Sequence, residues 1–200
     1  MKAHASHISE QGNFRVLVPD IYKGKLGVDV EEAHHLMSNL DFPAAVEEIS
    51  AAAAHLKAEG SPKVGVVGFC MGGALAMGSV AASKDIACAA PFYGVNFGLF
   101  TPDAVANKPV QGHFGLEDQM EGFSDPVTAR QLEATLKAAG NAQSEVHLYE
   151  GVGHAFMNES HSPFDSFDAR TDALGFPPYD AAQADLAWGR LLAFFKTHLA

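Results

Sequence analysis

The sequence predicts one α/β domain over residues 1–200, with a mostly parallel β-sheet and helices on both of its faces. Strand-like and helix-like stretches alternate along the chain, which is typical of parallel strands joined by helical crossovers. The strand-like stretches are apolar nearly throughout, as expected for strands buried on both faces. Apolar residues make up 48% of the 200 residues and charged residues 18%, so there is ample material for a hydrophobic core.

Five short apolar runs mark the expected strands. They are bounded by Gly, Pro, Asp or Ser residues, which end strands and begin turns. The second run is the clearest, because every residue after its initial lysine is valine or glycine. The expected strands cover residues 14–18, 63–68, 86–93, 109–115 and 144–149.

Helices are expected in the intervals between these strands. Residues 43–59 begin with a proline and stop before Gly60, which are usual start and stop signals. Residues 125–140 begin with Asp-Pro and end at a glycine. Further helices are expected at residues 30–37, as an amphipathic surface helix, and at residues 72–83.

The last helix is expected at residues 180–198. Asp180 with Gln183 resembles a capping box at its start. Apolar residues then recur at helical spacing and predict a core-facing stripe of Ala184, Trp188, Leu191, Leu192 and Phe195. The preceding segment, from His154 to Asp180, is rich in Gly, Pro, Asp, Ser and Phe and is expected to be a long loop.

Charge and composition exclude several classes of partner. Thirteen Lys and Arg against 24 Asp and Glu give a net charge of −11, without a basic cluster, which disfavours nucleic acids and anionic membranes. No apolar run is long enough to span a membrane, and the N-terminus has no signal-peptide core. Two cysteines do not make a disulfide framework, so a reducing, cytoplasmic compartment is expected.

The hexapeptide Gly-Phe-Cys-Met-Gly-Gly at residues 68–73 lies where a buried strand turns into a helix. It matches the nucleophile-elbow pattern G-x-[Ser/Cys]-x-G. We expect Gly68 and Gly72 to remove Cβ atoms that would collide across this turn, and Cys70 to project its sulfur beyond the sheet. The helix N-terminus favours a thiolate, and the Met71 amide is placed to donate to an oxyanion.

A cysteine nucleophile needs a base, and the base needs an acid that orients it. His154 follows the last expected strand, and Asp118 follows the fourth. With Cys70, these residues follow three different strands at one edge of a parallel sheet, where such sheets place their active sites. The chain order nucleophile, acid, histidine is that of α/β-hydrolases. Glu117 is the alternative for the acid.

The remaining cysteine and histidines are expected to be structural or surface residues. Cys88 lies inside an apolar strand and is expected to be inert. The pairs at positions 4 and 7 and at 34 and 35, together with His113 and His161, have no partner at ligand spacing, so no metal site is expected.

Five motifs together resemble the dienelactone hydrolase (carboxymethylenebutenolidase) family. In order they are Pro-Asp-Ile-Tyr at 19–22, the cysteine elbow, Phe-Tyr-Gly at 92–94, G-x-x-D ending at Asp118, and G-H-x-F around His154. The likeness covers roughly residues 8–200. It implies an α/β-hydrolase fold and hydrolysis of an ester or lactone through a thioester, with no cofactor.

The resemblance also implies the roles of the site residues. Cys70 would be the nucleophile, His154 the general base and acid, and Asp118 its orienting partner. Tyr93 would border the pocket. We expect the aromatic residues of the neighbouring motifs, Phe69 and Phe156, to contact the substrate with it.

The chain departs from the family pattern before its first expected strand. Family members carry a further N-terminal stretch with a central strand, and after it a loop with a glutamate and a second oxyanion amide. We therefore expect an N-terminally incomplete fold. The absent strand would lie between residues 14–18 and 63–68, so the sheet must close the gap, leave an edge unpaired or borrow a strand.

Two further departures concern the substrate. The arginines that hold the substrate carboxylate in dienelactone-cleaving members correspond here to Glu31 and Asn158, which cannot form a bidentate clamp. Dienelactone itself is therefore not the expected substrate. Residues 159–178 exceed what the family carries after the histidine, and are expected to be a surface excursion or a lid over the site.

Three functions remain open at this stage. The first is a cysteine-dependent hydrolase of small esters or lactones. The second is a catalytically impaired hydrolase-like binding module, since loss of one oxyanion donor typically costs about 10²–10³ in rate. The third is a redox-sensitive thiol at Cys70. The expected partner is a small molecule rather than nucleic acid or membrane, and the protein is expected to be a monomer or weak homodimer.

Overall fold

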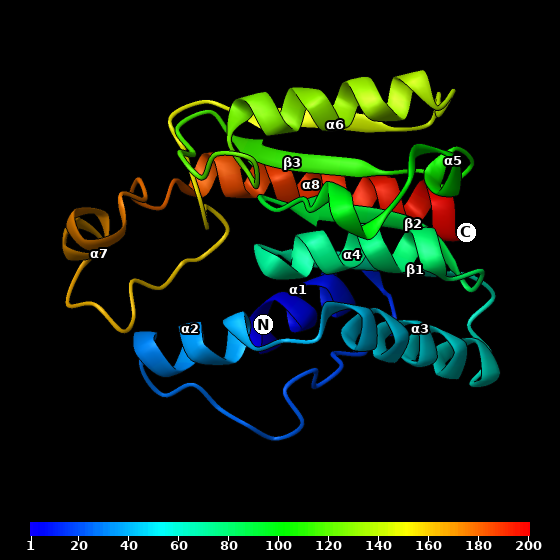
Figure 1. The fold of residues 1–200 in the computed structure, drawn as a ribbon, viewed down its shortest axis with the longest axis horizontal. Coiled ribbons are helices and arrows are strands. Elements are labelled where there is room, and N and C mark those ends of the chain that lie inside the picture. The colour runs from blue at the N-terminus through cyan, green and yellow to red at the C-terminus, as the bar shows by residue number, and fades with distance from the viewer.

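The computed structural model covers residues 1–200 and is built around a four-stranded parallel sheet (Figure 1). The strands are β1 (Val64–Phe69), β2 (Ile86–Phe92), β3 (Gln111–Gly115) and β4 (Glu145–Tyr149), in the spatial order β1-β2-β3-β4. Each strand is parallel to the next one along the chain. The prediction of a parallel sheet, and four of the five predicted strands, are confirmed.

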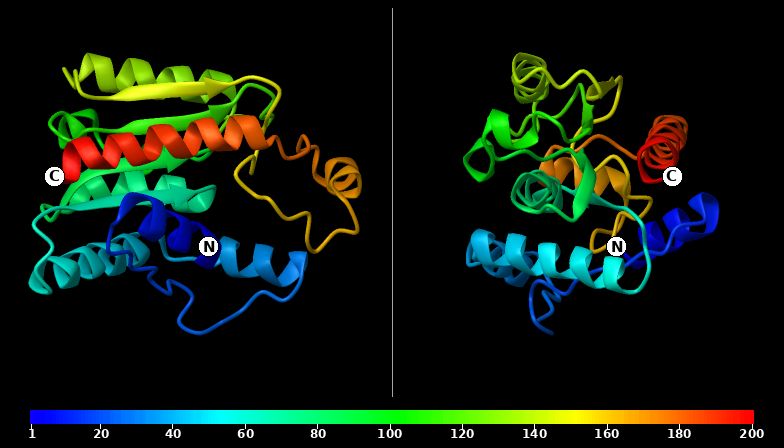
Figure 2. Two further views of the ribbon diagram at one scale, coloured as in Figure 1. Left: turned by 180° about the vertical axis from the view of Figure 1, so that it is seen from behind. Right: turned by 90° about the vertical axis from the view of Figure 1, so that its right-hand side faces the viewer.

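Eight α-helices and one short 3₁₀ helix surround this sheet. The 3₁₀ helix, η1, covers Phe97–Leu99. The α-helices are α1 (Lys2–Gly12), α2 (Val30–Ser38), α3 (Phe42–Ala58), α4 (Met71–Ala82), α5 (Pro102–Val105), α6 (Pro126–Ala138), α7 (Phe167–Leu174) and α8 (Ala181–Leu199). Figure 2 shows α1 and α8 on one face of the sheet and α4 and α6 on the other. None of the helices has both the length and the apolar character that crossing a membrane requires.

The two faces of the sheet carry separate hydrophobic cores. The core beneath α8 contains Trp188 and Leu191 from the helix and Cys88 and Ala90 from β2. The opposite core contains Ala89 from the same strand, with apolar residues from α4 and α6. Because β2 contributes side chains to both cores, it is buried on both faces, as its unbroken apolar sequence predicts.

The predicted start signals and the apolar stripe of the last helix are confirmed. The Asp125 side chain accepts hydrogen bonds from the first-turn amides of α6. The Asp180 side chain accepts one from the Gln183 amide at the start of α8, at 3.0 Å. Four of the five stripe residues are buried, and Leu192 is half-buried.

The predicted strand at residues 14–18 is wrong. Residues 14–20 have no regular secondary structure, and residues 14–19 make no backbone–backbone hydrogen bond. A β-strand forms by hydrogen bonding to a neighbouring strand, and residues 14–18 have no such neighbour, because β1 pairs only with β2. β1 is therefore an edge strand with one unpaired side.

Besides the four-residue helix α5, two longer α-helices were not expected from the sequence. The first, α1, has no side-chain cap and buries only Ile8 and Gly12, so it carries few of the usual helix signals. The second, α7, lies inside the segment expected to be a loop. It begins at Ser166, whose side chain accepts from the Ala169 amide, and ends at Gly175 in the left-handed conformation.

Candidate active site

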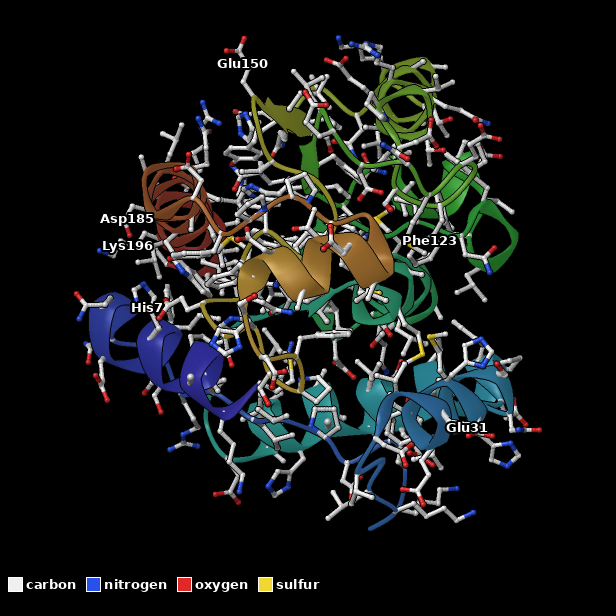
Figure 3. The ribbon with its side chains drawn as sticks, turned by 90° about the vertical axis from the view of Figure 1, so that its left-hand side faces the viewer. His7, Glu31, Phe123, Glu150, Asp185 and Lys196 are labelled. Atoms are coloured by element: carbon white, nitrogen blue, oxygen red, sulfur yellow. The ribbon has the colours of Figure 1, made fainter.

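The three predicted catalytic residues come together at the carboxyl edge of the sheet. Cys70 directly follows β1, Asp118 follows β3, and His154 follows β4. Figure 3 looks onto this edge, with α7 in front of it. Because parallel strands all end at this edge, three residues far apart in sequence become neighbours in space.

Cys70 occupies a strained turn between β1 and α4. Its φ of 56° and ψ of −123° are uncommon for a residue with a side chain. Gly68 makes this turn possible, because a Cβ at that position would overlap the Gly72 carbonyl. A Cβ on Gly94 would likewise overlap the Cys70 carbonyl. The expectation for Gly72 is wrong, because a Cβ there would meet open space.

A continuous line of polar contacts joins the sulfur to a carboxylate. His154 Nε2 lies 3.1 Å from Cys70 Sγ, and His154 Nδ1 lies 3.0 Å from Asp118 Oδ2. His154 and Asp118 are buried, while Cys70 is half-buried. Glu117 is exposed, so of the two candidate acids Asp118 is the one in contact with the imidazole.

A fourth polar residue, Ser124, contacts the same histidine. Its Oγ lies 3.1 Å from His154 Nδ1, and the residue is fully buried. Nδ1 therefore has two oxygen neighbours, one from Ser124 and one from Asp118. Nothing in the sequence distinguished Ser124, because it lies in the irregular stretch before α6 and belongs to no recognisable motif.

The surroundings of His154 favour its protonated form. Burial lowers the pKa of the imidazole, but the hydrogen bonds that it donates to Asp118 and Cys70, with the charges of both groups, outweigh burial and raise the pKa to about 9. The imidazolium form can donate from Nδ1 to the carboxylate and from Nε2 to the sulfur. The geometry therefore suits a thiolate beside an imidazolium.

The Met71 amide stands at the N-terminus of α4, next to the sulfur. It makes no backbone–backbone hydrogen bond, as is usual for the first amides of a helix. A helix N-terminus carries partial positive charge, so this free donor favours an anionic oxygen near Cys70.

The three expected substrate-contacting aromatic residues differ in their surroundings. Tyr93 is buried, its ring meets the His154 ring edge-on with centroids 5.2 Å apart, and its hydroxyl has no hydrogen-bond partner. Phe69 is half-buried against Phe92 and the face of α8. Phe156 is 1% exposed and packs within the core beneath α8, where its ring meets that of Tyr93 edge-on.

The segment after His154 packs against the site with its second half. The Phe176 ring centroid lies 4.9 Å from that of His154. Arg170 of α7 is buried, and its Nη2 donates to the Pro177 carbonyl at 3.0 Å. These contacts hold the end of the segment over His154. The segment predicted as an excursion or a lid therefore covers part of the site.

The two positions that stand where a carboxylate clamp was considered, Glu31 and Asn158, both lie on the surface. Glu31 is exposed on α2, and Asn158 is exposed after the histidine loop. Figure 3 shows Glu31 at the periphery of the molecule. No group of three or more His, Cys, Asp or Glu side chains is close enough to hold a metal ion. His4 instead packs against Phe69 and Trp188.

Known proteins resemble this chain over most of its length. The model of the dienelactone hydrolase family matches residues 1–199. A putative carboxymethylenebutenolidase of Aquifex aeolicus (strain VF5) is 29% identical over 210 aligned residues, covering 100% of this chain and 81% of that protein. A carboxymethylenebutenolidase of Pseudomonas putida is 31% identical, covering 82% of this chain and 72% of that protein.

Solved structures support the fold. The crystal structure of a dienelactone hydrolase-like promiscuous phosphotriesterase from metagenomic libraries has a TM-score of 0.77 at 18% identity, covering 100% of this chain and 80% of that one. The crystal structure of a putative dienelactone hydrolase of Klebsiella pneumoniae has a TM-score of 0.65 at 22% identity, covering 89% and 73% of the two chains. With a family match across nearly every residue and an α/β-hydrolase architecture, the chain belongs to the dienelactone hydrolase family.

Proposed function

We propose that this protein hydrolyses small carboxylic esters or lactones with Cys70 as nucleophile, His154 as general base and acid, and Asp118 as the residue that orients His154. The observation that carries the proposal is the line of contacts from the Cys70 sulfur through the imidazole to the Asp118 carboxylate, at 3.1 and 3.0 Å. A nucleophile, a base and an orienting acid in contact are what covalent catalysis of acyl transfer requires.

The first half of the reaction forms a thioester. The Cys70 thiolate attacks the carbonyl carbon of the substrate, and the π electrons of the carbonyl move to its oxygen. When the tetrahedral intermediate collapses, the carbon–oxygen bond to the alcohol breaks. The departing alkoxide takes the proton from His154 Nε2 and leaves as the alcohol, or stays tethered if the substrate is a lactone.

The second half regenerates the enzyme. Neutral His154 takes a proton from water at Nε2, and the resulting hydroxide attacks the thioester carbon. Collapse of this intermediate breaks the carbon–sulfur bond, releases the carboxylic acid and returns Cys70 as a thiolate beside the imidazolium. The Asp118 carboxylate keeps the Nδ1 proton in place through both halves, so Nε2 faces the reacting atoms.

The Met71 amide supplies one donor for the oxyanion of both intermediates. Its position at the start of α4 adds the partial charge of the helix N-terminus. Dienelactone is disfavoured as a substrate, because Glu31 and Asn158 offer no cation to its carboxylate. Neutral esters and lactones that fit beside Tyr93 and Phe69 are the proposed class.

Hydrolysis of p-nitrophenyl acetate by the purified 200-residue chain tests this proposal, with Cys70→Ala and Cys88→Ala run in parallel. The expected result is multiple turnovers in the unmodified chain and in Cys88→Ala, and none above background in Cys70→Ala. Burial raises the pKa of Cys88 to about 12, so this second thiol is a matched control. Turnover that survives in Cys70→Ala would show that the nucleophile is wrong.

A second candidate function is acyl binding without turnover, as expected of a catalytically impaired module. The observation that favours it is the cavity beside the elbow, whose lining includes Met71 and Gly72. If no second hydrogen-bond donor reaches the oxyanion from that side, Cys70 would still form the thioester. The tetrahedral intermediate of thioester hydrolysis would then not be stabilised enough for turnover. A single stoichiometric burst of p-nitrophenolate, with a stable acyl adduct on Cys70 by mass spectrometry, distinguishes this function from hydrolysis.

A further inference from the structure

The hydroxyl of Tyr22 lies against the nucleophile elbow, on the side of the cavity. Tyr22 ends the Pro-Asp-Ile-Tyr motif, which takes no part in the line of contacts from sulfur to carboxylate. Its hydroxyl donates to Met71 Sδ at 3.6 Å, and both residues line the cavity beside the elbow. A thioether is a weak acceptor, so the hydroxyl can turn to a better one. Tyr22 therefore brings an O–H donor to the residue whose amide is the proposed oxyanion donor.

The turn that carries Tyr22 is fixed in place from two directions. The Asp20 carboxylate accepts hydrogen bonds from the amides of Tyr22 and Gly24, at 3.2 and 2.7 Å, which is the usual role of an aspartate that begins a turn. Ile21 and Met71 pack on one small hydrophobic cluster, which also joins α3 to α4. The tyrosine is thus positioned against the start of α4 before a substrate arrives.

The hydroxyl of Tyr22 also lies within range of the charge on the nucleophile. Burial, and after it the negative charge of Cys70, raise the pKa of Tyr22 above its ordinary value of 10. The hydroxyl therefore keeps its proton, and can donate, over the pH range in which His154 is protonated. In both tetrahedral intermediates the oxyanion is two bonds from Cys70 Sγ, so it brings negative charge to the same region.

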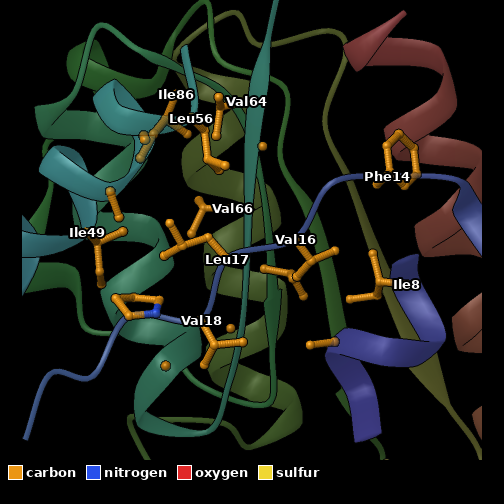
Figure 4. A pocket seen from close by; sticks show the side chains of 18 of the residues that line it. Ile8, Phe14, Val16, Leu17, Val18, Ile49, Leu56, Val64, Val66 and Ile86 are labelled. Carbon is orange, nitrogen blue, oxygen red and sulfur yellow. The ribbon is translucent and has the colours of Figure 1, made fainter. Parts of the chain in front are cut away.

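The cavity beside the elbow is lined mostly by hydrocarbon. Figure 4 shows Val18 and Val66 among its apolar side chains. Two lining side chains carry a hydroxyl, those of Tyr22 and Ser61, and Ser61 lies before β1, at the opposite end of the strand from Cys70. A hydrogen bond to an anion is stronger in apolar surroundings than in water. Of the two hydroxyls, that of Tyr22 is the one at the elbow.

We propose that the Tyr22 hydroxyl is a second oxyanion donor, which turns from Met71 Sδ to the substrate oxygen as each tetrahedral intermediate forms. The Cys70 sulfur bonds to the carbonyl carbon, the π electrons of the carbonyl move to its oxygen, and that oxygen accepts from the Tyr22 O–H and the Met71 N–H. Tyr22 transfers no proton. This inference rests on the proposed hydrolysis, and it names the donor that acyl binding without turnover would lack.

Tyr22→Phe removes the hydroxyl and keeps the ring, so it tests the donor directly. We expect kcat/KM for p-nitrophenyl acetate to fall about 10²-fold, as for other lost oxyanion donors. Alkylation of Cys70 by iodoacetamide should keep its rate, because this displacement at carbon forms no oxyanion. Tyr179→Phe is the matched control, since Tyr179 is also half-buried but stacks on Phe167 of α7. It should change neither rate.

A second measurement detects the same donor without turnover. The Cys70 thiolate adds to the carbonyl carbon of trifluoroacetone, a carbon–sulfur bond forms, and the carbonyl oxygen becomes an alkoxide like that of the intermediates. Fluorine NMR measures the dissociation constant of this adduct. We expect Tyr22→Phe to weaken the adduct by about tenfold or more, and Tyr179→Phe to leave its affinity unchanged.

The outcomes separate this inference from the proposed hydrolysis. Turnover that depends on Cys70 but has the same kcat/KM in Tyr22→Phe would overturn the role of Tyr22 alone. A parallel loss of hydrolysis and alkylation would also overturn it, because the tyrosine would then only support the elbow. If the chain acylates without turnover, the burst rate and the adduct affinity decide in the same way. Turnover that survives in Cys70→Ala would overturn the hydrolysis mechanism and this inference with it.

Discussion

At the scale of single residues, the site depends on what touches the two ring nitrogens of His154. Nε2 faces the sulfur of Cys70, whereas Nδ1 faces oxygens of Asp118 and Ser124. All of these neighbours can accept a hydrogen bond from a protonated ring, and none of them is a cation. The contacts with Asp118 and Cys70 explain why a buried imidazole, which would ordinarily be neutral, has a pKa raised to about 9.

This raised pKa predicts an alkaline limit to the hydrolysis of alkyl esters. Such esters leave as strongly basic alkoxides, so the leaving group needs the Nε2 proton of His154. As the pH rises through about 9 that proton is lost, and kcat/KM should fall about tenfold per pH unit. The measurement is a pH profile from 6 to 10.5 with ethyl acetate, and a flat profile up to pH 10.5 would contradict the assignment.

Ser124→Ala should lower the activity modestly by changing the surroundings of the same histidine. It removes one of the two oxygens at Nδ1, so we expect kcat/KM to fall by about three- to tenfold, since a lost hydrogen bond to a charged group costs about 1 kcal/mol or more. The alkaline limit should also move to lower pH, which a purely structural loss would not cause.

Ser79→Ala is the matched control for this variant. Ser79 is equally buried, in α4, but its hydroxyl has no hydrogen-bond partner. Its replacement should leave both the rate and the pH profile unchanged. An unshifted profile in Ser124→Ala would mean that the serine does not act through the imidazole.

Much of the candidate site can be predicted from the sequence at this scale. The rest cannot, and the reason is physical. Cys70 and His154 lie in motifs whose glycines indicate a tight turn of the backbone at each residue. The choice of Asp118 over Glu117 depends on which of two adjacent side chains turns inward after β3, and sequence does not fix that direction. Ser124 contacts His154 across 30 residues, so no local pattern could reveal it.

At the scale of elements, the elbow shows that two glycines of one motif have unequal roles. A Cβ on Gly68 would overlap the backbone of the following helix turn, whereas one on Gly72 would meet nothing within 4 Å. The motif alone suggests equal importance for both. The structure places the close approach of β1 and α4 at Gly68.

Gly68→Ala and Gly72→Ala form a matched pair that tests this difference. Gly68→Ala must push β1 and α4 apart, so we expect a loss of at least about 2 kcal/mol of stability and of most activity. Gly72→Ala lies in the first turn of α4, where alanine fits, and should leave stability unchanged or raise it by about 0.5–1 kcal/mol. Urea denaturation and the rate of Cys70 alkylation measure both effects, and equal destabilisation would contradict the prediction.

The same scale explains which elements the sequence predicted correctly. Strands β1 to β4 and helices α2, α3, α4, α6 and α8 carry apolar runs, apolar stripes or clear start and stop signals, so local information was sufficient. The run at residues 14–18 has the composition of a strand, but strand formation also requires a partner edge, which its own residues cannot supply. Half of the eight residues of α7 are polar, and the helix is held by the contact of Arg170 with Pro177 rather than by an apolar stripe.

At the scale of the whole molecule, the core beneath α8 encloses a chain of buried polar side chains around His113. His113 of β3 is fully buried, with Nδ1 2.7 Å from the Tyr149 hydroxyl and Nε2 3.1 Å from the Gln111 side-chain oxygen. Its ring stacks on Phe92, with centroids 4.1 Å apart. Both ring nitrogens are satisfied while the ring is neutral, so this network is consistent with the surrounding hydrophobic core.

This network predicts how the stability of the protein depends on acid. Burial first, and then the nearby charges of His147 and Arg190, hold the pKa of His113 well below its ordinary value of 6.5. The unfolded chain takes up this proton near pH 6.5 and the folded protein does not, so stability is complete above pH 6.5 and falls as the pH decreases below it. In His113→Gln, which retains hydrogen-bonding groups without the titration, the slope of unfolding free energy between pH 6 and 5 should decrease by up to about 1.4 kcal/mol per pH unit. Urea denaturation across this range measures the slope, and identical slopes in the two proteins would show that His113 is protonated within the folded core.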